Sequence, residues 1–252
     1  MPSVGRRKIE YIYTGIHKIY FKWPFDTLVL IYHIEVSDLD KECGKYKVLI
    51  AAAGCSRKMK RFKPLLPLGD TCILAQTICR FKEAGMNDIV VVIGYRRAEL
   101  FPMLKHLGVQ AVVNEDYDQT DMLESVKLGL NAMTADTRGI LLCPADIPLI
   151  EPETIRRLVE AGERADAFAY IPANKGRRGH PLLLGRRIMK EIMNYRGDNG
   201  IHGVLEQYAG RIKYIEVTDT NMLMDINRPE DYDRLLKVYE ELNRIKQGAQ
   251  SR

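Results

Sequence analysis

Residues 47–66, KVLIAAAGCSRKMKRFKPLL, join a strand-forming apolar run to a glycine and a basic loop. A continuous apolar run is typical of a strand that is buried on both faces of a sheet. Gly54 follows the run directly, and a residue without a Cβ lets the backbone approach a ligand. The N–H groups after it can surround phosphate oxygens, and nearby lysines add positive charge: Lys58, Lys60 and Lys63. From these residues alone, the loop is either an anion site or a basic surface turn.

The same order of strand and helix continues along the chain. Apolar runs at 89–94, 109–113, 139–143 and 167–171 alternate with helical patterns near 72–84, 96–106, 121–133 and 152–163. Later elements are strands at 181–184 and 211–217, helices at 185–194 and 200–208, and a closing helix from 229 to about 244. This order predicts a three-layer α/β/α domain with a mostly parallel sheet and right-handed crossovers. Ligands bind such sheets beyond the carboxyl ends of the strands.

Composition and charge exclude several classes of protein. The chain has 252 residues, 46% of them hydrophobic and 28% charged, which is typical of a globular protein with a sizeable core. The first 25 residues hold five basic residues against one acid and so supply most of the net charge of +5. The rest lacks the basic excess of a nucleic-acid binder, and no apolar run predicts a signal peptide or membrane span. Five scattered cysteines without Cys-x-x-Cys spacing favour a reducing cytoplasm and no built-in zinc site.

Three segments are expected: an N-terminal appendage over residues 1–45, the α/β domain over 46–246 and a C-terminal tail over 247–252. The appendage is rich in tyrosine and isoleucine, and it holds one strand pattern, Thr27 to Val36, without an evident partner pattern. Two interpretations stay open for it. Either the appendage is dispensable, or Thr27 to Val36 adds an edge strand to the sheet.

The loop after residue 53 resembles the signature of MobA-like nucleotidyltransferases, Leu-Ala-Ala-Gly-x-Ser-x-Arg-Met-Gly-x-x-Lys-x-Leu-Leu. The positions that match are Ala52, Ala53, Gly54, Ser56, Met59, Lys63, Leu65 and Leu66. The resemblance implies a Rossmann-like nucleotidyltransferase domain and a nucleotide-binding set of Ala52, Ala53, Gly54, Cys55, Ser56, Lys58 and Lys63. Two positions depart from the signature. Lys58 replaces an arginine and loses its bidentate fork, and Lys60 replaces a glycine, which implies a backbone that a side chain would crowd.

Asp146 follows the apolar run 139–143 within Pro144-Ala145-Asp146-Ile147-Pro148. A carboxylate just past a strand end is either a ligand for a hard cation such as Mg²⁺ or a turn residue that caps its own backbone. The family has Asp-x-Pro here, which implies that Asp146 binds the metal. The stretch 224–232 resembles the family's Asp/Asn-x-Asp/Asn-Thr-Pro-Glu-Asp and implies that Asp225 is a second metal ligand. Asn227 would offer an amide oxygen to the acceptor or to a metal-bound water, whereas Pro229, Glu230 and Asp231 fit a helix start.

Residues 114–129 are similar to the family's Asn-Pro-Asp-Tyr … Gly-Met-x-Ser-Ser loop, which approaches the nucleotide. Asn114 and Ser125 are retained and are implied to bind it, while Asp121 and Glu124 replace Gly and Ser. Two new carboxylates would repel a triphosphate, so either they point to solvent or the nucleotide sits differently. The alternative for this stretch is a solvated helix start that Thr120 or Asp121 caps.

Gly179-His180-Pro181 and the loop 197–200 resemble motifs of the molybdenum cofactor cytidylyltransferase branch, as does Ala52-Ala53-Gly54. These motifs imply that Gly179, His180, Asp198 and Asn227 bind the acceptor. A histidine before a proline can also be an ordinary turn residue. The matches run from about residue 47 to 232 in family order, and they begin far from the N-terminus, which favours a dispensable appendage.

The resemblance implies transfer of CMP from CTP to the terminal phosphate of molybdopterin, with Mg²⁺, Lys63 and Asp146 as the catalytic groups and a recipient molybdoenzyme as a possible partner. A phosphate monoester is already anionic near neutral pH and needs no general base. Two alternatives stay open. One is a cytidylyltransferase for a sugar or polyol phosphate, and the other is a catalytically silent nucleotide-binding regulatory protein, suggested by Lys60, Asp121 and Glu124.

Overall fold

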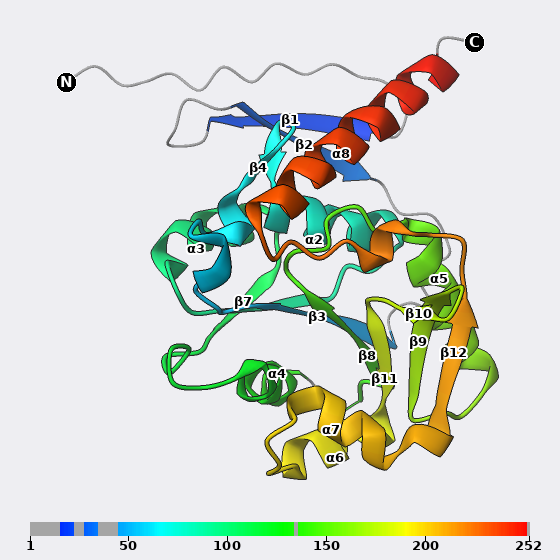
Figure 1. Ribbon diagram of the computed structural model, residues 1–252. Helices are drawn as coiled ribbons and strands as arrows, with labels where there is room; N and C mark the ends of the chain where they lie inside the picture. The colour runs from blue at the N-terminus through cyan, green and yellow to red at the C-terminus, as the bar shows by residue number, and fades with distance from the viewer. Residues whose placement is uncertain (1–15, 23–27, 35–44, 134–135, 251–252) are drawn as a thin grey trace.

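A computed structural model describes residues 16–22, 28–34, 45–133 and 136–250 of the chain (Figure 1). Its central sheet has eight strands in the order β10-β9-β11-β8-β3-β6-β7, with β12 paired to β9. Their bounds are β3 Tyr46–Ala52, β6 Ile89–Ile93, β7 Gln110–Val113, β8 Gly139–Pro144, β9 Ala169–Asn174, β10 Arg177–Arg178, β11 Leu182–Gly185 and β12 Ile212–Glu216. The strands β8, β3, β6 and β7 are mutually parallel, and β12 is parallel to β9. The expected mostly parallel sheet is confirmed, although β11 runs antiparallel between β8 and β9.

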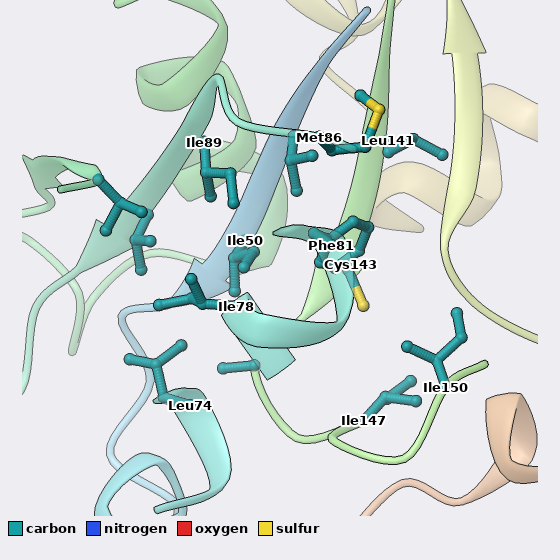
Figure 2. Packing of buried hydrophobic residues seen from close by; sticks show 14 of the residues in the cluster. Ile50, Leu74, Ile78, Phe81, Met86, Ile89, Leu141, Cys143, Ile147 and Ile150 are labelled. Carbon is teal, nitrogen blue, oxygen red and sulfur yellow. The ribbon is translucent and has the colours of Figure 1, made fainter. Parts of the chain in front are cut away.

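Helices cover both faces of this sheet, as expected for three layers (Figure 1). One face holds α2 (Ile73–Glu83), α3 (Arg97–His106) and α5 (Pro152–Arg164), and the other holds α4 (Met122–Asn131), α6 (Arg186–Asn194) and α7 (Gly200–Gln207). Side chains alternate along β3, so that Val48 and Ile50 pack on the first face and Leu49 on the second. Figure 2 shows part of the first layer, with Ile78 and Phe81 of α2 beside Ile50. Burial on both faces explains the continuous apolar runs of the sequence.

A third apolar cluster forms where α8 (Pro229–Gln250) crosses the loop after β3. Met59 and Leu66 of that loop are buried with Tyr232 and Leu235 of the helix. The helix continues beyond the expected end near Arg244, so the described part of the expected tail, 247–250, is helical. Within the described residues, no helix combines the length and apolar character needed to cross a membrane.

The appendage differs from its expected form. Residues Leu28–Ile34 form β2, inside the predicted strand, but β2 pairs antiparallel with β1 (Ile16–Lys22) in a separate two-stranded sheet. The alternative in which this stretch adds an edge strand to the main sheet is therefore wrong, because the backbone of β2 pairs with β1, a strand that the sequence pattern did not indicate. A second small ribbon, β4 (Pro67–Leu68) with β5 (Thr71–Cys72), also lay outside the predicted elements.

The loop after β3 contains a short 3-10 turn, Arg57–Met59, that ends in a left-handed residue. Lys60 has φ 54°, its backbone N–H bonds to the Arg57 carbonyl oxygen, and its side chain is exposed. The side chain therefore crowds nothing in this structure. The glycine of the family signature is explained by the left-handed backbone, which residues other than glycine adopt at a cost.

Replacing Lys60 by glycine should stabilise the fold. The substitution removes a left-handed cost of about 1–2 kcal/mol and adds an entropic cost of about 0.5–1 kcal/mol, for a net gain of up to about 1.5 kcal/mol. Urea unfolding of Lys60→Gly against the parent chain measures this difference. Lys58→Gly is the matched control, because Lys58 lies in the same turn without a positive φ and should lose stability. Equal losses in both variants would contradict the explanation.

A chain that begins at Lys45 should keep its melting temperature and its activity. The central sheet begins at Tyr46, and β1 and β2 pair with each other in a separate sheet, although β2 also approaches β5. Thermal unfolding followed by circular dichroism, together with the activity assay of the full chain, tests this expectation. An insoluble or inactive product would show that residues 1–45 are needed.

Candidate active site

A cleft opens at the carboxyl ends of β3 and β8, where the sequence placed the nucleotide. Seven of the predicted residues line it: Ala52, Ala53, Gly54, Ser56, Lys63, Ser125 and Asp146. Gly54 is exposed, and a Cβ built there would meet nothing within 4 Å. The backbone after β3 therefore borders open space that a ligand can occupy. The Ser56 hydroxyl accepts a hydrogen bond from the Lys63 backbone N–H at 3.2 Å, which closes the loop around this opening.

Lys63 and Asp146 form an ion pair in the wall of the cleft. The Lys63 Nζ lies 2.7 Å from the Asp146 Oδ2, and the two side chains are 17% and 15% exposed. The same ammonium donates to the Asn227 Oδ1 at 3.4 Å, and the Asn227 Nδ2 donates to the Asp225 Oδ2 at 2.5 Å. Four residues from three separate loops thus form one chain of contacts. The sequence predicts that Asp146 and Asp225 bind the metal and Asn227 the acceptor, and that Lys63 contacts the nucleotide.

A second cleft adjoins the first and shares Asp146 with it. Its lining includes Arg178, Gly179, His180, Asp225 and Asn227. The structure therefore brings the predicted metal ligands and three of the four predicted acceptor residues to one place. Any Cβ on Gly179 would lie 2.7 Å from the Met222 side chain, so this position needs a glycine.

His180 stands at the border between the second cleft and a third. Burial holds the pKa of His180 below its usual value, although the carboxylates of Asp146 and Asp225 oppose this shift. The ring is therefore neutral at pH 7. Its Nδ1 atom is buried and has no hydrogen-bond partner among the described residues. A buried polar atom without a partner is costly, so it is a natural contact for a bound ligand.

The third cleft lies between α7 and β12 and extends the second through Arg178, Gly179 and His180. The Arg178 guanidinium carbon lies 4.7 Å from the centroid of the Tyr214 ring, within the range of a cation–π contact. His202 and Ile212 also line this cleft. The sequence reasoning missed His202, Ile212 and Tyr214, which stand outside the motifs, and it gave no role to Arg178, which directly precedes Gly179.

Four predicted residues lie outside the first two clefts: Cys55, Lys58, Asn114 and Asp198. Lys58 and Asp198 are exposed, whereas Asn114 is buried. The Asn114 Nδ2 donates to the Ser125 and Thr120 hydroxyls at 3.0 Å each, and its Oδ1 accepts from the Asp116 N–H. Asn114 thus supports the nucleotide loop from behind.

Asp121 and Glu124, the two acidic departures from the family, have different surroundings. The Asp121 Oδ1 accepts a hydrogen bond from the Glu124 N–H at 3.1 Å, which confirms Asp121 as the cap of α4. Glu124 pairs with the buried Lys127 at 2.7 Å and does not line the first cleft. Asp121 does line it. Only one of the two carboxylates therefore borders the nucleotide cleft.

Tyr117 and Asp219 are further residues that the sequence reasoning missed. Tyr117 lines the first cleft and packs on Gly94, where a Cβ would approach it to 2.6 Å. Asp219 is 1% exposed and accepts hydrogen bonds from the Glu151 N–H, the Thr154 hydroxyl and the Asn221 N–H. It therefore fastens the segment before Asp225 to the start of α5. A tyrosine just after a strand was the available signal for Tyr117, and Asp219 had none.

The donor atoms at the shared wall suit a hard divalent cation. Asp146 and Asp225 offer carboxylate oxygens, and Asn227 offers an amide oxygen. The described residues contain no group of three or more His, Cys, Asp or Glu side chains that would hold a metal alone. Two carboxylates that need further oxygens from a bound phosphate are typical of Mg²⁺ sites.

Comparison with known proteins agrees with this geometry. The chain is 26% identical over 195 residues to the molybdenum cofactor cytidylyltransferase of Escherichia coli K12, which covers 77% of this chain and 97% of that protein. It is 29% identical over 181 residues to the bifunctional protein GlmU of Mycolicibacterium gilvum, but this match covers 69% of the chain and only 35% of GlmU. The chain thus spans about a third of that relative.

The fold and the family agree as well. A nucleotidyl transferase from Methanothermobacter thermautotroptrophicus superposes with a TM-score of 0.68 at 25% identity, over 78% of this chain and 98% of that one. The family model of the MobA-like NTP transferase domain matches residues 48–212, which is well over half of the chain. The strand, loop and carboxylate arrangement described above falls within or next to this match. The chain belongs to the MobA-like NTP transferase family.

Proposed function

We propose that this nucleotidyltransferase moves CMP from CTP to the terminal phosphate of molybdopterin and releases pyrophosphate. The observation that carries the proposal is the position of Asp146, which lines both the nucleotide cleft and the cleft with Gly179 and His180. A donor and an acceptor bound in these clefts would meet at Lys63 and Asp146. The similarity to the E. coli cytidylyltransferase supports the choice of both substrates.

The reaction needs positioning and charge neutralisation more than proton transfer. The acceptor phosphate, with a second pKa of about 6, is already a nucleophile at neutral pH. One of its oxygens attacks the α-phosphorus of CTP, and the bond from this phosphorus to the β-phosphate oxygen breaks. Both substrates are anions, so the enzyme must hold them together against their repulsion and stabilise the charge of the transition state.

Different residues of the chain would bind the phosphates, hold the metal and position the nucleotide loop. The backbone N–H groups of Gly54, Cys55 and Ser56 would bind phosphate oxygens, since Gly54 and Ser56 line the first cleft and Cys55 lies between them. Lys63 would place its ammonium against the reacting phosphates, with Lys58 as a more distant positive charge. Asp146 and Asp225 would hold Mg²⁺, which when bound lowers the negative charge of the triphosphate. Asn114 and Ser125 would keep the nucleotide loop in place.

The acceptor would enter the second and third clefts. Neutral His180 can exchange a hydrogen bond with it through the partnerless Nδ1, while Asn227 contacts its phosphate side. The Arg178–Tyr214 pair offers a flat wall beyond His180. Asp198 lies in the loop before α7 and would close this side.

A second candidate is cytidylyl transfer to a sugar or polyol phosphate. The polar side chains of the second cleft, among them Arg177, Arg178 and Asp225, favour it because they could bind hydroxyl groups. The catalytically silent alternative is less supported, since Lys60 is exposed and Glu124 is paired outside the nucleotide cleft.

We expect CTP to be the preferred nucleotide and molybdopterin to be the acceptor that supports turnover. Calorimetric titrations with CTP and GTP in the presence of Mg²⁺ measure the first preference. A pyrophosphate-release assay with molybdopterin, sugar phosphates and polyol phosphates measures the second. Equal or tighter binding of GTP contradicts the cytidylyl assignment, and turnover only with a sugar or polyol phosphate favours the second candidate.

Asp146→Asn should abolish turnover and leave the fold intact, because it removes a charge from the shared wall without adding volume. Lys63→Ala should slow turnover about 10- to 100-fold, since a hydrogen bond to a charged group contributes about 1.5–3 kcal/mol. Pyrophosphate release and melting temperature are the two measurements.

The matched control is Asp88→Asn. Asp88 forms an ion pair with Lys47 that is also 2.7 Å long, but at the opposite end of β3. This variant should retain the rate of the parent enzyme. Full activity in Asp146→Asn or Lys63→Ala would place the reaction in another loop.

A further inference from the structure

The nucleotide cleft has two unlike ends. Lys63 and Asp146 form the end that is shared with, or borders, the acceptor cleft, so the reacting phosphates belong there. Thr120, Asp121 and Ser125 of the α4 side line only the nucleotide cleft. If the α-phosphate lies at this shared wall and the backbone of Gly54 and Ser56 binds the other phosphates, the α4 side is left for the base or ribose. Asp121 therefore lies where the nucleoside is expected, away from the phosphates.

Among the described residues, no cation balances the charge of Asp121. Its Oδ1 accepts one backbone hydrogen bond, from the Glu124 N–H, and no described cation pairs with it. Glu124, by contrast, has Lys127 at 2.7 Å. The Asp121 side is also close to the start of α7, because a Cβ on Gly200 would lie 3.8 Å from the Asp121 Oδ2. An uncompensated carboxylate weakens the binding of a triphosphate unless it meets a hydrogen-bond donor of the nucleotide.

We infer that Asp121 selects the base by accepting a hydrogen bond from the exocyclic amino group of cytosine. This inference rests on the proposed function, in which CTP occupies this cleft. Uracil carries a carbonyl oxygen where cytosine carries the amino group, so UTP would place an acceptor against a carboxylate. The departure at Asp121 would then discriminate between two nucleotides of nearly the same shape, by rejecting the one that leaves the carboxylate unsatisfied.

Titration calorimetry with CTP and UTP, each with Mg²⁺, tests the inference without any need for turnover. The parent enzyme should bind CTP at least about tenfold more tightly than UTP. Asp121→Asn should reduce this ratio to within about threefold, because an amide can donate to the uracil oxygen as well as accept from the cytosine amine. Asparagine also caps helices well, so the start of α4 should be preserved.

Glu124→Gln is the matched control. It removes the neighbouring carboxylate, which does not line the cleft, and should leave the CTP to UTP ratio unchanged. An unchanged ratio in Asp121→Asn, or an equal loss of both nucleotides, would overturn the inference and point to the ribose or to helix capping alone. Pyrophosphate release from CTP is measured in parallel. If CTP still supports pyrophosphate release but the binding ratio does not change in Asp121→Asn, only the base-selecting role of Asp121 is wrong. If the parent enzyme binds neither CTP nor UTP, the proposed function is wrong as well.

Discussion

The parallel pairing of β3 with β8 sets the position of Lys63 and Asp146, on which the rest of the candidate site depends. The two strands are in register up to Ala51 and Pro144, and the Ala145 N–H still bonds to the Ala51 carbonyl oxygen beyond the last strand residue. The loops that follow therefore leave the sheet at the same level. This is why Lys63 and Asp146, 83 residues apart, meet at 2.7 Å. Both strands are buried on both faces, so the apolar core fixes the register that the polar loops depend on.

The second cleft, which holds Asp225 and Asn227, is positioned by a buried carboxylate instead. Asp225 and Asn227 are exposed and would be free to move if only their own contacts held them. The segment before them is tied down by Asp219, whose carboxylate accepts three hydrogen bonds in the interior. A buried charge is tolerated only when it is fully bonded, so the backbone around it has little freedom. Met222 then holds Gly179 and His180 in place. Its backbone oxygen accepts a hydrogen bond from the His180 N–H, and its side chain fills the space beside Gly179.

The departures from the family signature have separate physical explanations. The exposed Lys60 keeps the left-handed backbone that a glycine would adopt without cost, and Glu124 is neutralised by a lysine of its own helix. Of these three departures, only Asp121 brings a charge into the first cleft that no described cation pairs with. Under the proposed function, this departure would affect the end where the nucleoside is expected and leave the residues proposed to bind phosphate unchanged.

The sequence by itself determined the layers, the order of the main strands and helices from β3 onward, and the candidate residues for the chemistry. Buried strands and amphipathic helices leave periodic apolar patterns, and Lys63 and Asp146 stand in loops directly after such strands. Only the tertiary structure decided the antiparallel insertion of β11, the pairing of β1 with β2, the packing of Tyr117 on Gly94 and the anchoring by Asp219. Each of these depends on strand pairing or on contacts that no local pattern records. Local periodicity shows which face of an element is buried, but the partner it is buried against is chosen by long-range packing.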